Sequence, residues 1–239
     1  MSNYSGYMMA NQAGASFTVA ELEQPRPVVA GGASLVYRDH AYGLPRWQEY
    51  TLYSTIPLSD ELEGERSTWS YQLFVVRGHA KLIVLAARRR IVDYALAQIL
   101  DRRIHPNLRK INVYIDQMIE FCTKLESEFL ITSLHGRFSG AARSVRSMSL
   151  YGDDVTNSPI YRDNHPYFNF HSCGMGRRLF GGLPSIRPND EGEIARVSHD
   201  GFINLNLSTR RQAQELIRVV DFIVSHRWVE DWVHSKDQP

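Results

Sequence analysis

Cysteine is scarce in this chain, and long apolar runs are missing. Its 239 residues include two cysteines, too few for the disulfide framework of a small secreted domain. The longest purely apolar run is Leu82–Ala87, six residues, whereas a membrane-spanning helix needs about twenty. The first residues have neither the basic start nor the apolar stretch of a secretory signal. We therefore expect a cytoplasmic protein that makes no membrane contact.

Net charge is also small, +1 at pH 7, so total charge favours no class of partner. Its distribution along the chain is uneven. Between Arg77 and Arg146 there are thirteen Lys or Arg and six Asp or Glu, a balance of +7, and the rest of the chain holds fourteen against twenty, a balance of −6. A basic middle between acidic flanks predicts an anionic partner, or ion pairing within the chain or across subunits.

The composition is that of a folded domain, with 43% apolar and 22% charged residues. Residues 1–30 are rich in Ser, Gly, Ala, Asn and Gln and show no sustained period, so we expect a loose N-terminal arm there. Residues 31–239 are then expected to form a single domain. The alternative is two subdomains that meet near residues 150–190.

Runs rich in β-branched and aromatic residues predict β-strands. Asp200–Gly201, between two such runs in 192–207, is the preferred sequence of a two-residue hairpin turn, because both turn positions need positive φ. The other predicted strands lie at 34–40, 48–56, 128–138, 144–152 and 68–87, the last divided at Gly78–His79.

Apolar residues at helical spacing predict three helices. They lie at 88–103, from Ile115 to Leu125, and after Ser208, which can cap its helix. Residues 153–190 are dense in Gly, Pro, Asn and Asp and predict a long irregular segment. Because strands and helices come in clusters, the expected fold class is α+β, with a mixed or largely antiparallel sheet flanked by at least three helices.

The segment HPYFNFHSCGMGRR, residues 165–178, concentrates chemically active side chains. His and Cys are zinc ligands, a Cys before Gly can act as a nucleophile, and Arg beside Gly can bind phosphate. The glycines at 176 and 181 have the spacing of a phosphate-binding loop, but Gly182–Leu183 stands where that loop requires Lys–Ser or Lys–Thr. If the protein is an enzyme, its expected catalytic residues are Asp153, Asp154, His165, His171 and Cys173.

Metal ligation by this segment lacks a complete motif. His171 and Cys173 would face the same side of an extended strand, but zinc needs three or four ligands, and the second cysteine, Cys122, lies on the apolar stripe of a predicted helix. Zinc and magnesium are the metals that such side chains would hold. No cofactor and no metal ligand is therefore assigned.

The cations of the basic middle form the other candidate site. Arg88–Arg90 open a predicted helix, where the helix dipole disfavours positive charge by a few tenths of a kcal/mol to about 1 per residue, and this cost favours an anionic partner. Such cations contact phosphates without reading sequence. The expected phosphate-binding residues are Arg88, Arg89, Arg90, Arg102, Arg103, Arg109, Lys110, Arg137, Arg143 and Arg146.

These patterns predict a non-catalytic module that binds nucleic acid or another polyanion, as an accessory subunit of a microbial multi-protein system. A metal-dependent hydrolase or nuclease centred on residues 153–178 is one alternative. The other is a structural assembly subunit without a ligand, whose arginines meet acids on a protein partner or on a second copy in a homo-oligomer. A steep loss of binding with rising salt would distinguish the first interpretation from the other two.

Overall fold

The structure is a computed structural model that describes residues 4–11, 34–38, 41–54, 69–76, 82–89, 91–93, 96, 108–124, 127–138, 147–178, 193–206 and 211–229.

The strands in these residues are β1 Tyr4–Asn11, β2 Ser34–Arg38, β3 Trp47–Ser54, β4 Trp69–Val76, β5 Leu82–Arg88, β6 Leu108–Lys110, β7 Phe129–Phe138, β8 Ser147–Tyr151, β9 Phe168–Arg177, β10 Ala195–Ser198 and β11 Phe202–Leu205. They form one sheet in the order β2-β3-β4-β5-β1-β11-β10-β9-β7-β8, and β6 pairs with β1. Each of these pairings is antiparallel.

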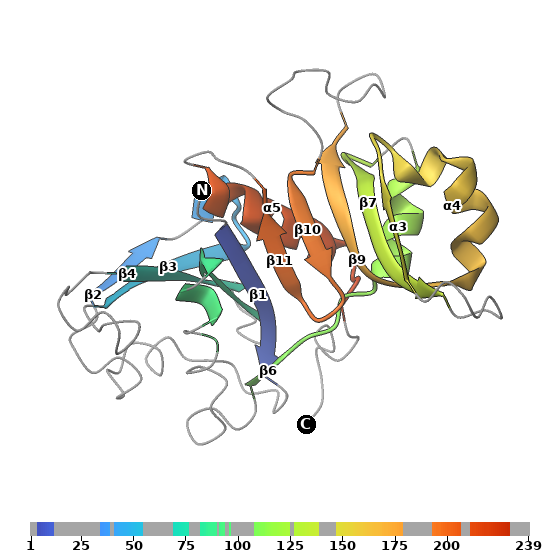
Figure 1. Cartoon of the computed structure of the whole chain (residues 1–239). Coiled ribbons are helices and arrows are strands. Elements are labelled where there is room, and N and C mark those ends of the chain that lie inside the picture. The colour runs from blue at the N-terminus through green and yellow to red at the C-terminus, as the bar shows by residue number, and fades with distance from the viewer. Residues whose placement is uncertain are drawn as a thin grey trace, which may run out of the picture.

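Two helices cover one face of this sheet (Figure 1). Helix α5 (Gln212–Ser225) crosses β1 and β11, and its Leu216 lies so close to Gly6 that a Cβ there would be 2.9 Å from a leucine methyl. Helix α3 (Ile115–Cys122) packs on β7 and β9 and buries its apolar stripe. The strand residues that face the two helices complete one apolar core, which includes Met8, Val84, Ile131, Met175, Val197 and Ile203.

The expected α+β fold with at least three helices flanking the sheet is wrong. The described part of the chain is mostly antiparallel sheet, and its helices are few: α3, α5, the six-residue α4 (Pro159–Asn164), short 3₁₀ turns, and helical residues at 89, 91–93 and 96. The remainder of the predicted helix 88–103 lies outside the described residues. Sheet content was underestimated because two strands occur where the sequence showed no strand-like period.

The first of these strands is β1, which lies in the middle of the sheet where a loose arm was expected. It pairs with β5 on one side and with β11 and then β6 on the other. Its side chains are buried on both faces: Met8 and Ala10 lie in the core, and Ser5, Tyr7 and Met9 are buried on the opposite face. A strand buried on both faces has no apolar–polar alternation, so periodicity does not reveal it. The division into an arm and a single domain otherwise stays a prediction.

The second is β9, which occupies residues 168–177 of the segment expected to be irregular. The pairing of β7 with β9 shifts register at two places, and at one of them His171 is the extra residue of a β-bulge. The bulge interrupts the alternation of side chains, and the glycines at 174 and 176 add turn-like composition. Both features hide a central strand from a sequence-based reading.

Several other predictions are confirmed in position. Strands occupy most of 34–40, 48–56, 128–138 and 144–152, two strands flank Gly78–His79, and α3 begins at Ile115. Strands β10 and β11 form a hairpin around Asp200–Gly201, as predicted. The turn differs in detail, because Gly201 has φ of 76° while Asp200 has no positive φ. A Cβ on Gly201 would also lie 2.6 Å from the carbonyl oxygen of Ile111, so both strain and space require glycine there.

Candidate functional site

A row of polar residues crosses the sheet on the face opposite α3 and α5. Consecutive members pair directly across neighbouring strands from β8 to β1: Tyr151, Ser133, Gly174, Arg196, Asn204 and Ser5. A second row runs through Ser149, His135, Ser172 and Ser198. The face of these strands that packs on the helices is apolar, so the two rows give this half of the sheet a distinct polar surface.

Hydrogen bonds join four side chains of the first row and two neighbouring ones, Asn206 and Glu193, into a polar network. The polar network consists of Ser5, Asn204, Asn206, Glu193, Arg196 and Ser133. Ser5 donates to Asn204 at 2.9 Å, and Asn204 donates to Asn206 at 3.3 Å. Asn206 donates to Oε1 of Glu193 at 2.8 Å. The network therefore links the central strand β1 to the far half of the sheet.

Glu193 is the centre of this network. Its side chain is 12% exposed, and Arg196 lies 2.9 Å from Oε1. The hydroxyl of Ser133 donates to Oε2. A buried carboxylate is tolerated when it is paired and hydrogen bonded, and both conditions hold here. Gly174 makes the arrangement possible, because a Cβ on residue 174 would overlap both the Glu193 carboxylate and the Ser133 hydroxyl.

His135 lies beside this network in the second row. Its Nδ1 lies 2.9 Å from the Ser149 hydroxyl, and its ring meets that of Tyr151 edge to face at 5.3 Å. Its Nε2 is shielded from solvent and has no hydrogen-bond partner among the described residues. Burial, followed by the Arg196 guanidinium, lowers the pKa of His135 below its ordinary 6.5, against the opposing effect of Glu193. The imidazole is therefore neutral at pH 7, able to donate or accept one hydrogen bond at Nε2.

The polar surface becomes exposed toward the sheet edge, where β7 and β8 form a hairpin. Arg137, Ser147, Ser149, Tyr151 and Asn169 are exposed, and by strand alternation they share the face that bears His135. We call these six residues the hairpin face. It contains one cation and no acidic residue, and Tyr151 is 68% exposed. The connection between the two strands, residues 139–146, lies outside the described residues; its sequence contains Arg143, Arg146 and no acid.

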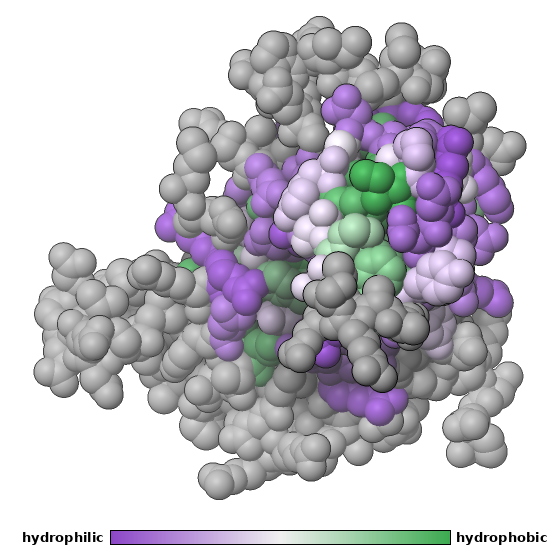
Figure 2. Space-filling model, turned by 45° about the vertical axis from the view of Figure 1, so that its right-hand side comes forward, coloured by the Kyte–Doolittle hydropathy of each residue, from purple (hydrophilic) through white to green (hydrophobic). Residues whose placement is uncertain are grey.

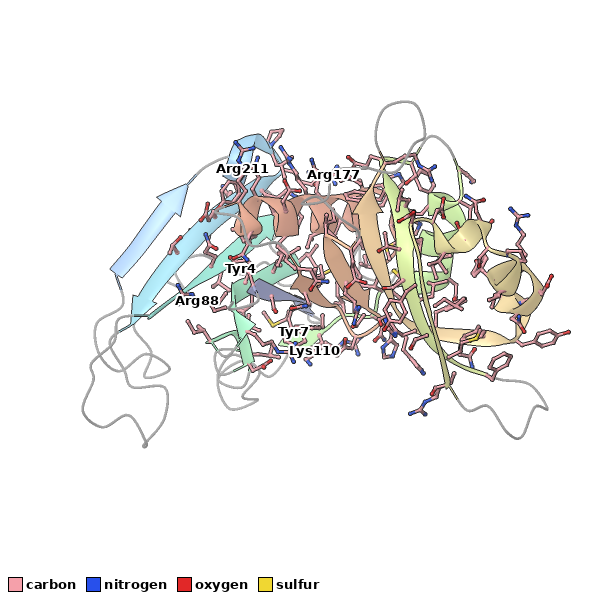
Figure 3. The ribbon with its side chains drawn as sticks, turned by 45° about the horizontal axis from the view of Figure 1, so that its top comes forward. Tyr4, Tyr7, Arg88, Lys110, Arg177 and Arg211 are labelled. Carbon is pink, nitrogen blue, oxygen red and sulfur yellow. The ribbon has the colours of Figure 1, made fainter. Side chains whose placement is uncertain are left out.

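Two of the predicted phosphate-binding cations are paired within the chain. Arg89 lies 2.8 Å from Asp93 and 4.1 Å from the centre of the Phe202 ring. Lys110 lies 3.7 Å from Asp200, and its ammonium is 4.1 Å from the centre of the Tyr7 ring. Figure 3 shows the Lys110 and Tyr7 side chains close together. Acids and aromatic rings of the same chain thus already contact these cations.

The described cations of the basic middle are spread out rather than gathered. Arg88 pairs with Tyr4 and Arg109 with Ala10, so they lie about 20 Å apart along β1. Arg137 lies on β7, separated from β1 by three strands. Arg90, Arg102, Arg103, Arg143 and Arg146 lie outside the described residues. Of the predicted phosphate-binding residues, Arg137 is the one that belongs to the hairpin face.

The expected catalytic residues are dispersed over several local structures. Asp154 accepts hydrogen bonds from Thr156 at 2.6 Å and Asn157 at 2.8 Å, which orders the turn after β8. Asp153 is exposed beside it. His165 is exposed, stacks on Tyr161 at 5.2 Å, and its Nδ1 lies 3.1 Å from the carbonyl oxygen of Arg162.

Cys173 and His171 are separated by exposure. Cys173 is fully buried in the core, and burial raises the pKa of its thiol well above the ordinary value. His171 is exposed, with its ring 6.0 Å from that of His199. Among the described residues, no group of three or more His, Cys, Asp or Glu could hold a metal ion. The hydrolase alternative stays a prediction.

No protein-family model matches the chain. No curated protein is similar to it either. Within the part that the structure describes, no helix is long and apolar enough to cross a membrane. The site therefore has to be judged on its own chemistry.

The sequence did contain a signal for the hairpin face. The segments SLHGR (133–137) and SMSLY (147–151) place polar residues at every second position, which in strands gathers them on one face. Their pairing with each other, and with β9, is what the sequence alone does not supply. Glu193 was not identified because its partners Ser133 and Arg196 come from separate strands.

Proposed function

We propose that the chain binds single-stranded nucleic acid on the hairpin face. The observation that supports this is the position of Arg137: it is exposed, it belongs to the hairpin face with His135 and Tyr151, and none of the six residues of the hairpin face is acidic. A cation that no neighbouring carboxylate neutralises attracts phosphate more strongly than one in an ion pair.

Each residue type on the face suits a different part of a nucleotide. Arg137 can contact phosphate oxygens. Tyr151 is exposed enough for a base to stack on it, and stacking on an aromatic side chain is worth about 1–3 kcal/mol per base. Ser149 and Asn169 offer hydrogen bonds to base edges or sugars, and exposed side chains on a sheet face suit unpaired bases rather than a duplex groove.

Binding to phosphates releases counterions, so affinity must fall steeply with salt. Fluorescence anisotropy of a labelled 20-nucleotide single strand, titrated with the protein at several potassium chloride concentrations, measures this directly. A duplex of the same length serves as the comparison. Weak, salt-independent binding, or a preference for the duplex, would contradict the proposal. A cytoplasmic location accompanies it, because nucleic acid is accessible there.

A further inference from the structure

Strand β8 ends the sheet, and among the described strands it pairs only with β7. The amide of Gly152, next to β8, donates to the carbonyl oxygen of Thr132 at 3.0 Å. Backbone groups alternate in direction along a strand, so those of residues 148 and 150 also point toward β7. The amides and carbonyls of Ser147, Ser149 and Tyr151 therefore point away from β7, toward an edge that no described strand occupies.

This edge lacks the features that usually prevent strands from associating. Its sequence, SMSLY, contains no charged residue and no proline, and β8 pairs with β7 without a register shift. Natural proteins protect edge strands with lysines, prolines or bulges, because an unprotected edge offers a row of unpaired donors and acceptors. The available backbone groups thus favour addition of another strand.

We propose that β8 pairs antiparallel with β8 of a second copy of this chain, about a two-fold axis at Ser149. In that register Ser149 faces its own copy, and Ser147 faces Tyr151 of the other chain, so every outward-pointing amide meets an outward-pointing carbonyl. Met148 faces Leu150 of the other chain. Both are half-buried, so apolar side chains meet on one face and polar ones on the other. The strand is complementary to itself.

The surface around β8 supports association on this side. The exposed large apolar residues of the described part are Tyr151, Ile160 and Tyr167; Tyr151 ends β8, and the other two lie in the connection from β8 to β9. Figure 2 shows apolar surface among polar residues on the side of the molecule that carries α3 and α4. Tyrosine is one of the residues that supply most of the binding energy in protein interfaces.

The dimer does not depend on nucleic-acid binding, although it bears on it. Ser147, Ser149 and Tyr151 belong to the hairpin face, so pairing about Ser149 joins the two hairpin faces into one surface across the two-fold axis. A single sheet would then run through both chains.

The first test is the molar mass in solution, measured by size exclusion with light scattering, for the unmodified chain and two variants at Ser149. Ser149→Pro removes the central outward amide and leaves the bonds to β7 in place, so we expect a monomer. Ser149→Ala also loses the hydroxyl but keeps the amide, so we expect a dimer. A monomeric unmodified chain, or a dimer that persists in Ser149→Pro, would overturn the proposal.

The second test needs no destabilising substitution. Across the axis the two Ser149 Cα atoms would lie about 5.5 Å apart, within the range of a disulfide. Both native cysteines are buried, so Ser149→Cys introduces an accessible thiol. We expect mild oxidation to give a disulfide-linked dimer within minutes. The control Arg162→Cys, also exposed but on α4, should stay mostly monomeric. Equal yields for the two variants, or no linked dimer from Ser149→Cys, would show that β8 does not meet its copy at this point.

Discussion

The carboxylate of Glu193 lies directly over the backbone of Gly174, where any side chain would displace it. This relationship explains a glycine in the middle of a central strand, where glycine normally weakens packing. It also explains how a carboxylate that is 12% exposed keeps Ser133 and Arg196 as partners.

Gly174→Ala should therefore destabilise the protein. The added methyl group would force Glu193 away from Ser133 and Arg196, and crowding of this kind typically costs about 1–3 kcal/mol in free energy of unfolding. Urea unfolding followed by circular dichroism measures the loss. Gly152→Ala is the matched control: its nearest neighbour would be Val155 Cγ2 at an ordinary 3.9 Å, so its effect should stay within about 0.5 kcal/mol. Equal effects of the two substitutions would show that Glu193 does not constrain residue 174.

Both thiols should be unreactive in the folded protein. Burial raises the pKa of Cys122 to about 11 and raises that of Cys173 well above its ordinary value, so neither thiol ionises at pH 8. With Ellman's reagent at pH 8 we expect no fast release of thionitrobenzoate when the protein is native. In urea we expect two reactive thiols per chain. Fast reaction of one thiol in the native protein would instead favour the catalytic interpretation of Cys173.

Stability should depend on pH through His135. Its folded-state pKa lies below the ordinary 6.5, so the unfolded chain binds the proton more readily than the folded chain. The stability that the folded chain gains from holding His135 neutral is fully present above pH 6.5. It is lost as the pH falls from 6.5 toward the folded-state pKa of His135. Thermal unfolding between pH 8 and pH 5 should show a smaller decline for His135→Asn than for the unmodified chain. Identical declines would mean that His135 protonates equally easily in both states.

Asp221 should stabilise the packing of α5 on the sheet mainly through Trp47. The indole N–H of this fully buried tryptophan donates to Asp221 at 2.7 Å, whereas the Arg46–Asp221 pair is 3.7 Å apart and its arginine is 47% exposed. Asp221→Ala leaves a buried donor unpaired and should cost about 1–3 kcal/mol. Arg46→Ala should cost at most about 1 kcal/mol, because exposed ion pairs contribute little. Urea unfolding of the two variants compares these values, and the opposite order would contradict the assignment.

Local sequence signals predicted the elements whose two faces differ. The apolar stripe of α3 and the turn chemistry of Asp200–Gly201 are examples, because periodicity and turn preference act over a few neighbouring residues. Strand β1 is buried on both faces, and the bulge at His171 interrupts the alternation of β9. The sequence signal failed at these two strands for that physical reason.

The candidate site was predicted only in part, since its residues come from strands far apart in the chain. Arg137 was identified from the local excess of cations. The sequence did not identify Glu193, Ser133 and Arg196. A single charged residue beside an irregular stretch is usually solvent-exposed, and the partners of Glu193 are adjacent to it only in the folded sheet. Residues 165–178 concentrate chemically active side chain types, yet Cys173 faces the core and Gly174 leaves space for the Glu193 carboxylate.

Arg137 tests the central claim most directly. Binding of a labelled 20-nucleotide single strand should weaken in Arg137→Ala, and the slope of log affinity against log salt should fall by about one, the loss expected when one phosphate contact is removed. Arg162→Ala removes another exposed arginine, on α4 and outside the hairpin face, and should change neither quantity. Equal effects of the two substitutions, or an unchanged slope in Arg137→Ala, would contradict nucleic-acid binding on the hairpin face.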